Sequence, residues 1–126
     1  MSISSLSDIR SPRGFHLDRE HLLNLVASDR ELVKTLLTTY LTASGSEVST
    51  LLQAITTDDV EVTARYAHKI RGSLRYLGAR RIEAMLCDVE TAARAYDLQT
   101  LRTHYRPIES DYRQLELEIR HWLTEL

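Results

Sequence analysis

The sequence predicts an all-α protein, an antiparallel four-helix bundle with a short additional helix at its N-terminal end. Three observations support this fold class. Only four of the 126 residues are glycine and two are proline, so few positions interrupt a helix. Apolar residues recur three and four positions apart through most of the chain, which is the period of an α-helix packed on one side. No stretch shows the strict alternation of a half-buried strand.

The N-terminal part of the chain predicts a tail followed by a short helix. Residues 1–15 are rich in serine and show no sustained apolar period, so we expect a flexible tail or linker before a helical bundle at 16–126. Asp18 is placed to cap a short helix that ends at Ala27, because its side chain can accept a hydrogen bond from a free backbone N–H of the first turn.

A long helix is predicted next. Asp29 offers a second N-terminal cap, and the apolar face that follows it continues to Ile55. The Gly45-Ser46 pair interrupts the pattern without ending it. We therefore expect one long helix that can kink at this pair.

The middle of the chain predicts a helical hairpin. Turn and cap residues at 56–59 precede a helix that carries His68, and Gly78 is placed to end that helix. A further helix is expected from Ala79 to Tyr96. The two helices are joined by a tight turn and should therefore lie antiparallel.

The last helix is predicted from apolar residues that alternate four and three apart between Leu101 and Trp122. Pro107 falls within this pattern. Because proline lacks a backbone N–H and clashes with the preceding turn, we expect a break or kink near Arg106.

Composition and charge exclude several classes of protein. A formal net charge of −2 gives no general attraction to nucleic acid or to an anionic membrane. No apolar run is long enough to cross a bilayer, and the N-terminus lacks the apolar core of a signal peptide. Cys87 is the only cysteine, so an internal disulfide is excluded. We expect a cytoplasmic monomer that binds neither nucleic acid nor membrane, either on its own or as a domain of a larger protein.

One helix face collects polar and cationic groups around His68. At 100° per residue, Ala64, Arg71, Gly72 and Arg75 all lie within about 60° of it. Glycine inside a helix costs about 1 kcal/mol relative to alanine, so Gly72 indicates a functional or packing requirement. We expect its missing side chain to clear the approach to the imidazole. The opposite side is apolar and should face the core: Ala67, Ile70, Leu74 and Leu77.

This stretch resembles a known family. The segment His68-Lys69-Ile70-Arg71-Gly72-Ser73, followed by Leu77-Gly78-Ala79, resembles the signature of the histidine-containing phosphotransfer (HPt) domain, His-x-Leu-Lys-Gly-Ser with Leu-Gly after it. The resemblance continues through Ile82, Leu86 and Glu90. It implies a four-helix bundle that receives a phosphoryl group on one exposed histidine and exchanges it with aspartates of receiver domains in a two-component phosphorelay. Arg71 stands where the family most often has lysine, and the segment Leu74-Arg75-Tyr76 is bulkier than usual.

The resemblance implies roles for individual residues. His68 would react through Nε2 while Nδ1–H donates to an acceptor, for which Glu90 is the candidate. Arg71 is expected to pair with the phosphoryl oxygens. Lys69 and Arg75 are expected to steer an acidic receiver surface.

Candidates for the docking surface are apolar residues near the histidine face: Ala64, Val62, Leu17 and Leu22. The other histidines, His16, His21, His104 and His121, have no comparable setting, and their spacing predicts no metal site.

We expect a phosphoryl carrier without kinase activity of its own, because no glycine-rich ATP-binding region is present. It should hold no bound cofactor, with Mg²⁺ held by the receiver partner.

Three alternatives remain open at this stage. The turn at Leu77–Ile82 is similar to that of a DNA-binding helix-turn-helix, with Arg80 and Arg81 opening the second helix. The phosphoacceptor domain of a histidine kinase is a second alternative, although such domains usually have an acidic residue where this chain has Lys69. A non-catalytic helical interaction domain is the third, and it leaves Gly72 unexplained.

Overall fold

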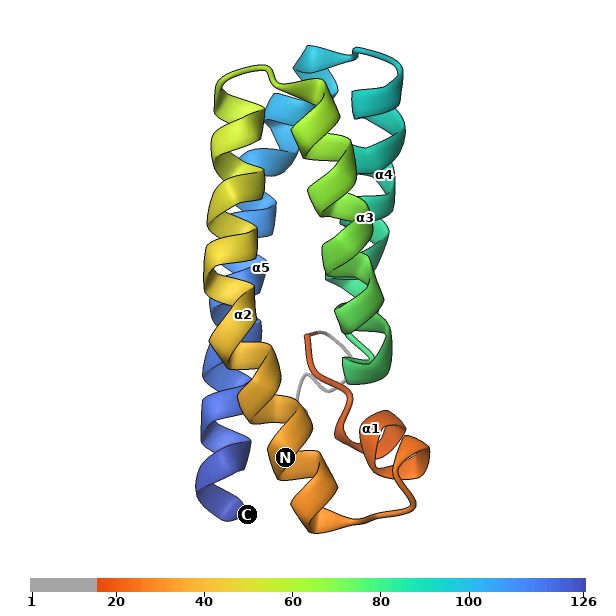
Figure 1. Ribbon diagram of the computed structural model, residues 1–126, viewed down its shortest axis with the longest axis vertical. Helices are drawn as coiled ribbons and strands as arrows, with labels where there is room; N and C mark the ends of the chain where they lie inside the picture. Colours follow the sequence, from red (N-terminus) through yellow and green to blue (C-terminus); the bar gives the residue numbers. More distant parts are fainter. Residues whose placement is uncertain (1–15) are drawn as a thin grey trace, which may run out of the picture.

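A computed structural model describes residues 16–126, and the tail expected at 1–15 lies outside the described residues. The described part forms five helices: α1 (Arg19–Leu25), α2 (Arg30–Thr56), α3 (Val60–Leu77), α4 (Arg80–Arg94) and α5 (Leu98–Glu125). Helices α2 to α5 form an elongated antiparallel bundle, and α1 lies beside its lower end (Figure 1). The predicted all-α bundle with a short N-terminal helix is confirmed. None of the described helices is long and apolar enough to span a membrane.

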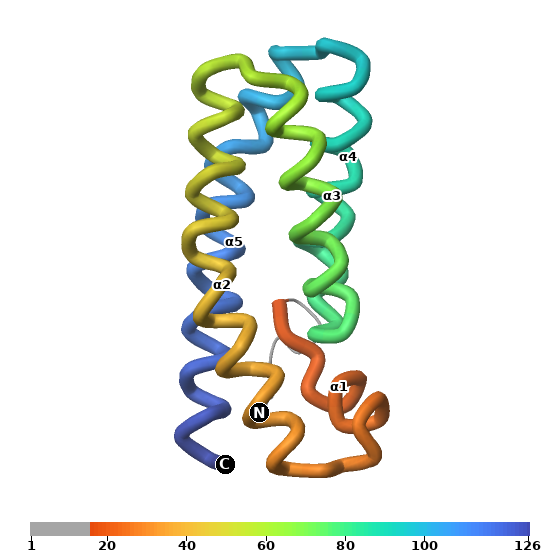
Figure 2. Tube along the Cα trace, viewed as in Figure 1, coloured from red at the N-terminus to blue at the C-terminus, as the bar shows by residue number. Residues whose placement is uncertain are grey.

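The four bundle helices form a closed ring in which neighbours in sequence are neighbours in space. Helix α3 packs against α2 and α4, and α5 packs against both α4 and α2. Figure 2 shows that the α2–α3 and α4–α5 connections lie at one end of the bundle, whereas the α3–α4 turn lies toward the end that holds α1 and the C-terminus. Each of the helices α3 and α4 therefore has one face on the core and one face on the surface.

Aspartate side chains begin four of the helices. Asp18, Asp29 and Asp59 each accept a hydrogen bond from the backbone N–H three residues later, as the sequence predicted for this kind of residue at these places. Asp97 does the same at the start of α5. Helix α4 has no side-chain cap.

Two helices are shorter than predicted. Helix α1 ends at Leu25 rather than at Ala27, which has a positive φ of 52° and therefore lies outside the helix. Helix α4 spans Arg80–Arg94, and Tyr96, with φ 57°, lies beyond its end. In both cases a left-handed backbone conformation follows the helix and terminates it.

A break or kink was expected near Arg106, and the break is wrong, because α5 continues as one helix from Leu98 to Glu125 with Pro107 inside it. A proline within a helix costs about 3 kcal/mol. Full burial of one leucine or isoleucine side chain contributes roughly 1.5–3 kcal/mol, and Leu101 and Ile108 are each only 1% exposed on either side of the proline. The packing of these side chains therefore offsets the local cost.

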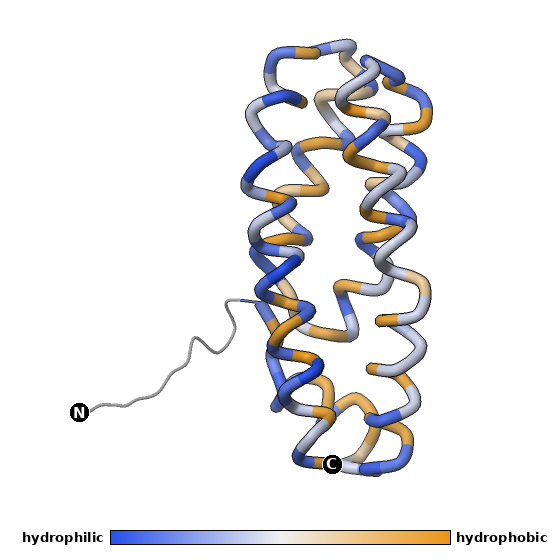
Figure 3. Tube along the Cα trace, turned by 90° about the vertical axis from the view of Figure 1, so that its left-hand side faces the viewer, coloured by the Kyte–Doolittle hydropathy of each residue, from blue (hydrophilic) through white to orange (hydrophobic). Residues whose placement is uncertain are grey.

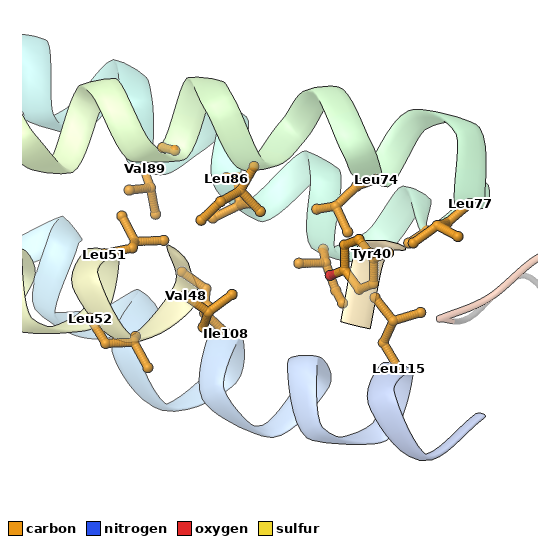
Figure 4. Packing of buried hydrophobic residues seen from close by; sticks show 14 of the residues in the cluster. Tyr40, Val48, Leu51, Leu52, Leu74, Leu77, Leu86, Val89, Ile108 and Leu115 are labelled. Carbon is orange, nitrogen blue, oxygen red and sulfur yellow. The ribbon is translucent and has the colours of Figure 1, made fainter. Parts of the chain in front are cut away.

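The hydrophobic core runs the length of the bundle. Along each helix, hydrophobic and hydrophilic residues alternate at short intervals (Figure 3), so that every helix has an apolar stripe. In Figure 4, Val48 and Leu51 of α2 gather with Val89 of α4 and Ile108 of α5, and Tyr40 lies farther along beside Leu74. The residues of α3 predicted to face the core are confirmed as buried: Ala67, Ile70, Leu74 and Leu77. This burial turns the opposite face of α3, with His68, toward solvent.

The start of α1 covers the end of α3. The backbone N–H of Asp18 donates to the carbonyl of Leu77 at 3.0 Å, and His21 Nε2 lies 3.0 Å from the carbonyl oxygen of Arg75. Between these contacts Gly78 ends α3 in the left-handed conformation, with φ 68°. The carbonyl groups of Arg75 and Leu77 thus have partners in the segment that begins α1, and the carbonyl group of Leu74 accepts from the N–H of Ala79.

A buried polar cluster joins the first described residues to α4 and α5. His16 is 6% exposed, and its Nδ1 lies 2.8 Å from Oε2 of Glu118. Its Nε2 lies 3.8 Å from Asp111, which also pairs with Arg81 at 2.9 Å. This structural role was not predicted for His16 from the sequence. Arg81, which suggested DNA recognition, pairs instead with an acidic side chain, and so does Arg80, 3.8 Å from Asp18.

Candidate functional site

His68 lies near the middle of α3, and its side chain is 71% exposed. The α3–α4 hairpin places Glu90 beside it, with His68 Nδ1 3.3 Å from Glu90 Oε2. The carboxylate is 12% exposed and lies between the two helices. The structure thus brings together the two residues for which the sequence predicted a donor–acceptor pair.

Two arginines hold the carboxylate of Glu90. Arg71 Nη1 of α3 donates to Oε1, and Arg94 Nη2 of α4 donates to Oε2 at 2.8 Å. The hydrogen bond from Arg94 is the largest influence that lowers the pKa of Glu90; Arg71 and His68 lower it further, while burial acts in the opposite direction. The net result is a pKa below the ordinary value, so Glu90 is ionised at neutral pH and remains an acceptor for Nδ1–H.

The lowered pKa of Glu90 predicts a pH dependence of stability. A carboxylate whose pKa is lowered in the folded protein stabilises the fold fully when the pH is above its ordinary pKa of 4.5. This contribution is lost as the pH falls through the pKa of the folded state. We therefore expect Glu90→Gln to lose less stability than the wild type as the pH is lowered below about 4.5. Urea denaturation from about pH 7 to about pH 3 measures this. Glu109→Gln, which removes a carboxylate 3.6 Å from Arg113 on the outside of α5, is the control, and parallel curves for wild type and Glu90→Gln would contradict the prediction.

The two arginines differ in exposure. The side chain of Arg71 is 19% exposed, and its Nε is buried without a hydrogen-bond partner. Arg94 is 65% exposed. Pairing of Arg71 with a phosphoryl group stays a prediction, and its guanidinium is engaged with Glu90 in this structure. Arg94 was not singled out from the sequence, although a cation four residues after Glu90 on one helix was a usable signal.

The cations predicted to steer a receiver are exposed, and both have acidic partners. Lys69 Nζ lies 3.4 Å from Glu47 of α2 and 5.6 Å from the centre of the Tyr66 ring. Arg75 Nε donates to Glu83 of α4 at 2.9 Å. These pairs hold the side chains at the rim of the histidine face, where both keep about three-fifths of their surface exposed.

The predicted apolar docking residues are mostly buried. Ala64 is 7% exposed; it is one of the residues that line a surface hollow, but it is not an exposed docking residue. Leu17 and Leu22 are 3% and 0% exposed, and the prediction that they belong to a docking surface is wrong. They were misplaced because α1 packs against α3, which the sequence pattern does not show. Val62 is half-buried.

A hollow of about 490 Å³ lies beside His68, between α3 and the end of α4. Besides His68, its lining includes two arginines, Arg65 and Arg94, one acidic residue, Glu61, and three apolar residues, Val60, Ala64 and Ala93. Tyr96, 69% exposed, lines the hollow beyond the end of α4. Arg65, Arg94 and Tyr96 therefore line the same surface hollow as His68.

Gly72 is exposed, and a Cβ added there would have no atom within 4 Å apart from its own helix and chain neighbours. Packing therefore does not require a glycine at this position. The residue lies one turn beyond His68 on the same face, so access to the imidazole stays the predicted reason for its missing side chain.

Replacement of Gly72 tests this interpretation. We expect Gly72→Ala to raise the free energy of unfolding by about 1 kcal/mol, because alanine is the better helix former and its methyl group enters open space. Gly72→Gln should also fold, but its longer side chain should block phosphoryl transfer. Urea denaturation and a transfer assay on both variants measure the two effects; full transfer by Gly72→Gln would show that the glycine does not clear the approach.

The described residues contain no group of three or more His, Cys, Asp and Glu side chains arranged to hold a metal ion. The chemistry available at the site is that of an exposed imidazole, an ionised carboxylate on its Nδ1 side and nearby guanidinium groups. This combination suits transfer of an anionic group to and from the imidazole.

Comparison with known protein families agrees with this arrangement. The model of the Hpt domain family matches residues 35–126, which include α3, α4 and every residue that contacts Glu90. The chain belongs to the Hpt domain family. It is a histidine phosphotransfer module of a phosphorelay, and Hpt domains are phosphoryl carriers that interact with receiver domains. In the part of the chain that the structure describes, nothing supports the DNA-binding alternative.

A solved structure shares the fold. The crystal structure of histidine-containing phosphotransfer protein B (HptB) from Pseudomonas aeruginosa PAO1 superposes with a TM-score of 0.80, over 88% of this chain and 96% of that chain. The two sequences are 21% identical, so this similarity establishes the fold. Among curated proteins no sequence matches significantly.

Proposed function

We propose that His68 is the phosphoacceptor of this module, taking a phosphoryl group from an aspartyl phosphate of one receiver domain and passing it to another receiver. The observation that carries the proposal is the pairing of an exposed imidazole with an ionised carboxylate on its Nδ1 side, at 3.3 Å. Glu90 keeps the proton on Nδ1, and the lone pair of Nε2 is then available for attack.

Transfer of the phosphoryl group to Nε2 does not require the imidazole to lose a proton. The Nε2 lone pair attacks phosphorus, the N–P bond forms, and the bond between phosphorus and the aspartate oxygen breaks, so that the receiver's carboxylate is the leaving group. The phosphorylated ring then carries a positive charge shared with Nδ1–H. The negative charge of Glu90 stabilises this ring, and the reverse step returns the phosphoryl group to an aspartate.

The receiver supplies the remaining parts of the reaction. We place Mg²⁺ on the receiver, where it neutralises the equatorial oxygens of the phosphoryl group during transfer. Lys69 and Arg75 lie at the rim of the histidine face and would meet the acidic surface of the receiver. We propose that the module itself is a carrier without kinase activity and that it acts as a monomer. We place it in the cytoplasm, since the exposed thiol of Cys87 suits a reducing compartment.

The experiment that tests the proposal is incubation with a receiver domain carrying labelled aspartyl phosphate. We expect transfer of label to this chain, and the linkage should be labile in acid and stable in alkali, as a phosphoramidate is. Peptide mapping under alkaline conditions should locate the label on His68. Label on another residue would contradict the proposal.

A further inference from the structure

We propose that the two arginines bound to Glu90 have different roles. Arg71 stays bound to Glu90, whereas Arg94 is the cation that moves to the phosphoryl group on His68. This inference rests on the proposed function of His68. It reassigns the phosphoryl contact from the arginine within the family signature to one on the neighbouring helix.

The contacts of Arg71 suit a fixed role. Its side chain is mostly buried between α3 and α4, and it donates to Oε1 of Glu90, the oxygen that does not face the imidazole. If Arg71 moved outward, this charge-assisted hydrogen bond would break, and Oε1 of Glu90 would lose its hydrogen-bond donor. The contact is made by Nη1 alone, while Nε of Arg71 is buried without a hydrogen-bond partner.

The contacts of Arg94 suit a mobile role. It is 65% exposed, and it donates to Oε2 of Glu90, the oxygen that faces His68 Nδ1. It also lines the hollow that His68 lines. Because the guanidinium end of this pair is exposed, Arg94 can exchange Oε2 for another anionic partner without leaving a buried cation unpaired.

Phosphorylation of His68 supplies such a partner. A phosphoryl group with up to two negative charges beside the hollow attracts Arg94, and the arginine leaves Oε2 for a phosphoryl oxygen. Oε2 is then free to accept the Nδ1–H of a ring that has become cationic. One movement thus adds a cation at the phosphoryl group and strengthens the hydrogen bond that holds the ring.

The expected consequence is a longer-lived phosphohistidine. Loss of a charge-assisted hydrogen bond from the phosphorylated form should shift its equilibrium by about tenfold. We therefore expect Arg94→Gln to shift the phosphoryl equilibrium about tenfold toward the receiver's aspartate and to shorten the lifetime of the phosphohistidine by a similar factor. Arg94→Lys, which keeps the positive charge, should keep the equilibrium and the phosphohistidine lifetime close to those of the wild type.

The test uses the full chain labelled with phosphoramidate, a small phosphoryl donor, so that the lifetime is measured without a receiver. The equilibrium is then measured with a receiver domain, and ³¹P NMR reports the environment of the phosphoryl group. Arg120→Gln is the matched control, because this substitution removes the same charge. Arg120 pairs with Glu116 at the same spacing on α5, and its side chain is 60% exposed. Arg65→Gln removes the other cation of the hollow, whose guanidinium lies over the Tyr66 ring.

The outcomes are distinguishable. A shift in Arg94→Gln that exceeds those in Arg120→Gln and Arg65→Gln, with rescue by lysine, supports the proposal. Equal shifts in Arg94→Gln and Arg65→Gln would overturn the assignment to Arg94, and a shift only in Arg71→Gln would return the role to Arg71. If the wild type takes no label on His68, the proposed function itself has failed, and this failure is visible before any arginine is changed.

Discussion

Replacing His68 with glutamine is expected to abolish phosphoryl acceptance by this protein. The amide of glutamine has a similar polarity, but its nitrogen lone pair is delocalised into the carbonyl group and cannot attack phosphorus. The substitution should leave the fold intact, because the imidazole is 71% exposed and its contact in the structure is the carboxylate of Glu90. Transfer of label from a phosphorylated receiver should fall at least about 10³-fold, to the background of the assay.

His121→Gln is the matched control for this experiment. His121 lies on α5, its side chain is also 71% exposed, and its Nε2 lies 3.0 Å from Oε2 of Glu125. It therefore shares the exposure and the acidic neighbour of His68 but lies on a different helix. We expect wild-type labelling of His121→Gln; acid-labile, alkali-stable label that persists in His68→Gln would falsify the assignment of the acceptor.

Among the glycines that the structure describes, Gly78 is expected to cause the largest loss of stability when it is replaced with alanine. Gly78 has φ 68°, a conformation that costs about 1–2 kcal/mol for a residue with a Cβ. The added Cβ would also lie 2.5 Å from Cβ of Asp18 and 3.2 Å from Cβ of His21, so α1 must shift away from the end of α3. Overpacking of this kind costs typically about 1–3 kcal/mol, and the free energy of unfolding should therefore fall by roughly 2–5 kcal/mol.

Urea denaturation of Gly78→Ala and Gly45→Ala measures this effect. Gly45 lies within α2, and a Cβ added there would meet the Tyr112 hydroxyl oxygen at 3.9 Å, an ordinary contact. Alanine at Gly45 should therefore leave stability unchanged or raise it by up to about 1 kcal/mol. Similar midpoints for the two variants would show that neither the left-handed conformation nor the contact with α1 matters at Gly78.

The fold was largely predictable because its signals are local. The caps at Asp18 and Asp29, the glycine at the end of α3 and the apolar period of each helix all act within a few residues of their own position. Pro107 is the instructive exception, since its local cost is outweighed by apolar contacts with other helices. No local pattern measures those contacts.

The residues of the candidate site also divide into those that local spacing placed and those that it did not. His68, Arg71 and Gly72 are three and four residues apart, so helical geometry alone places them on one face. Glu90 was reached through the family resemblance, and the structure places it beside His68. Arg94 contacts Glu90 within α4, four residues apart, a local signal that was not used. Glu47 of α2 reaches Lys69 of α3, and this contact was not predicted because it depends on how the two helices are rotated.

The sequence by itself determined the class of fold, the starts of most helices, and the orientation of His68 away from the core, because these follow from backbone hydrogen bonding and the 3.6-residue period. Tertiary structure decided which groups share the carboxylate of Glu90, that Leu17 and Leu22 are buried in the core, and that His16 joins the chain to α5. These features depend on the distances between side chains from separate helices. Those distances are set by the packing of the whole bundle, and a change in the rotation of one helix would alter them without altering any local pattern.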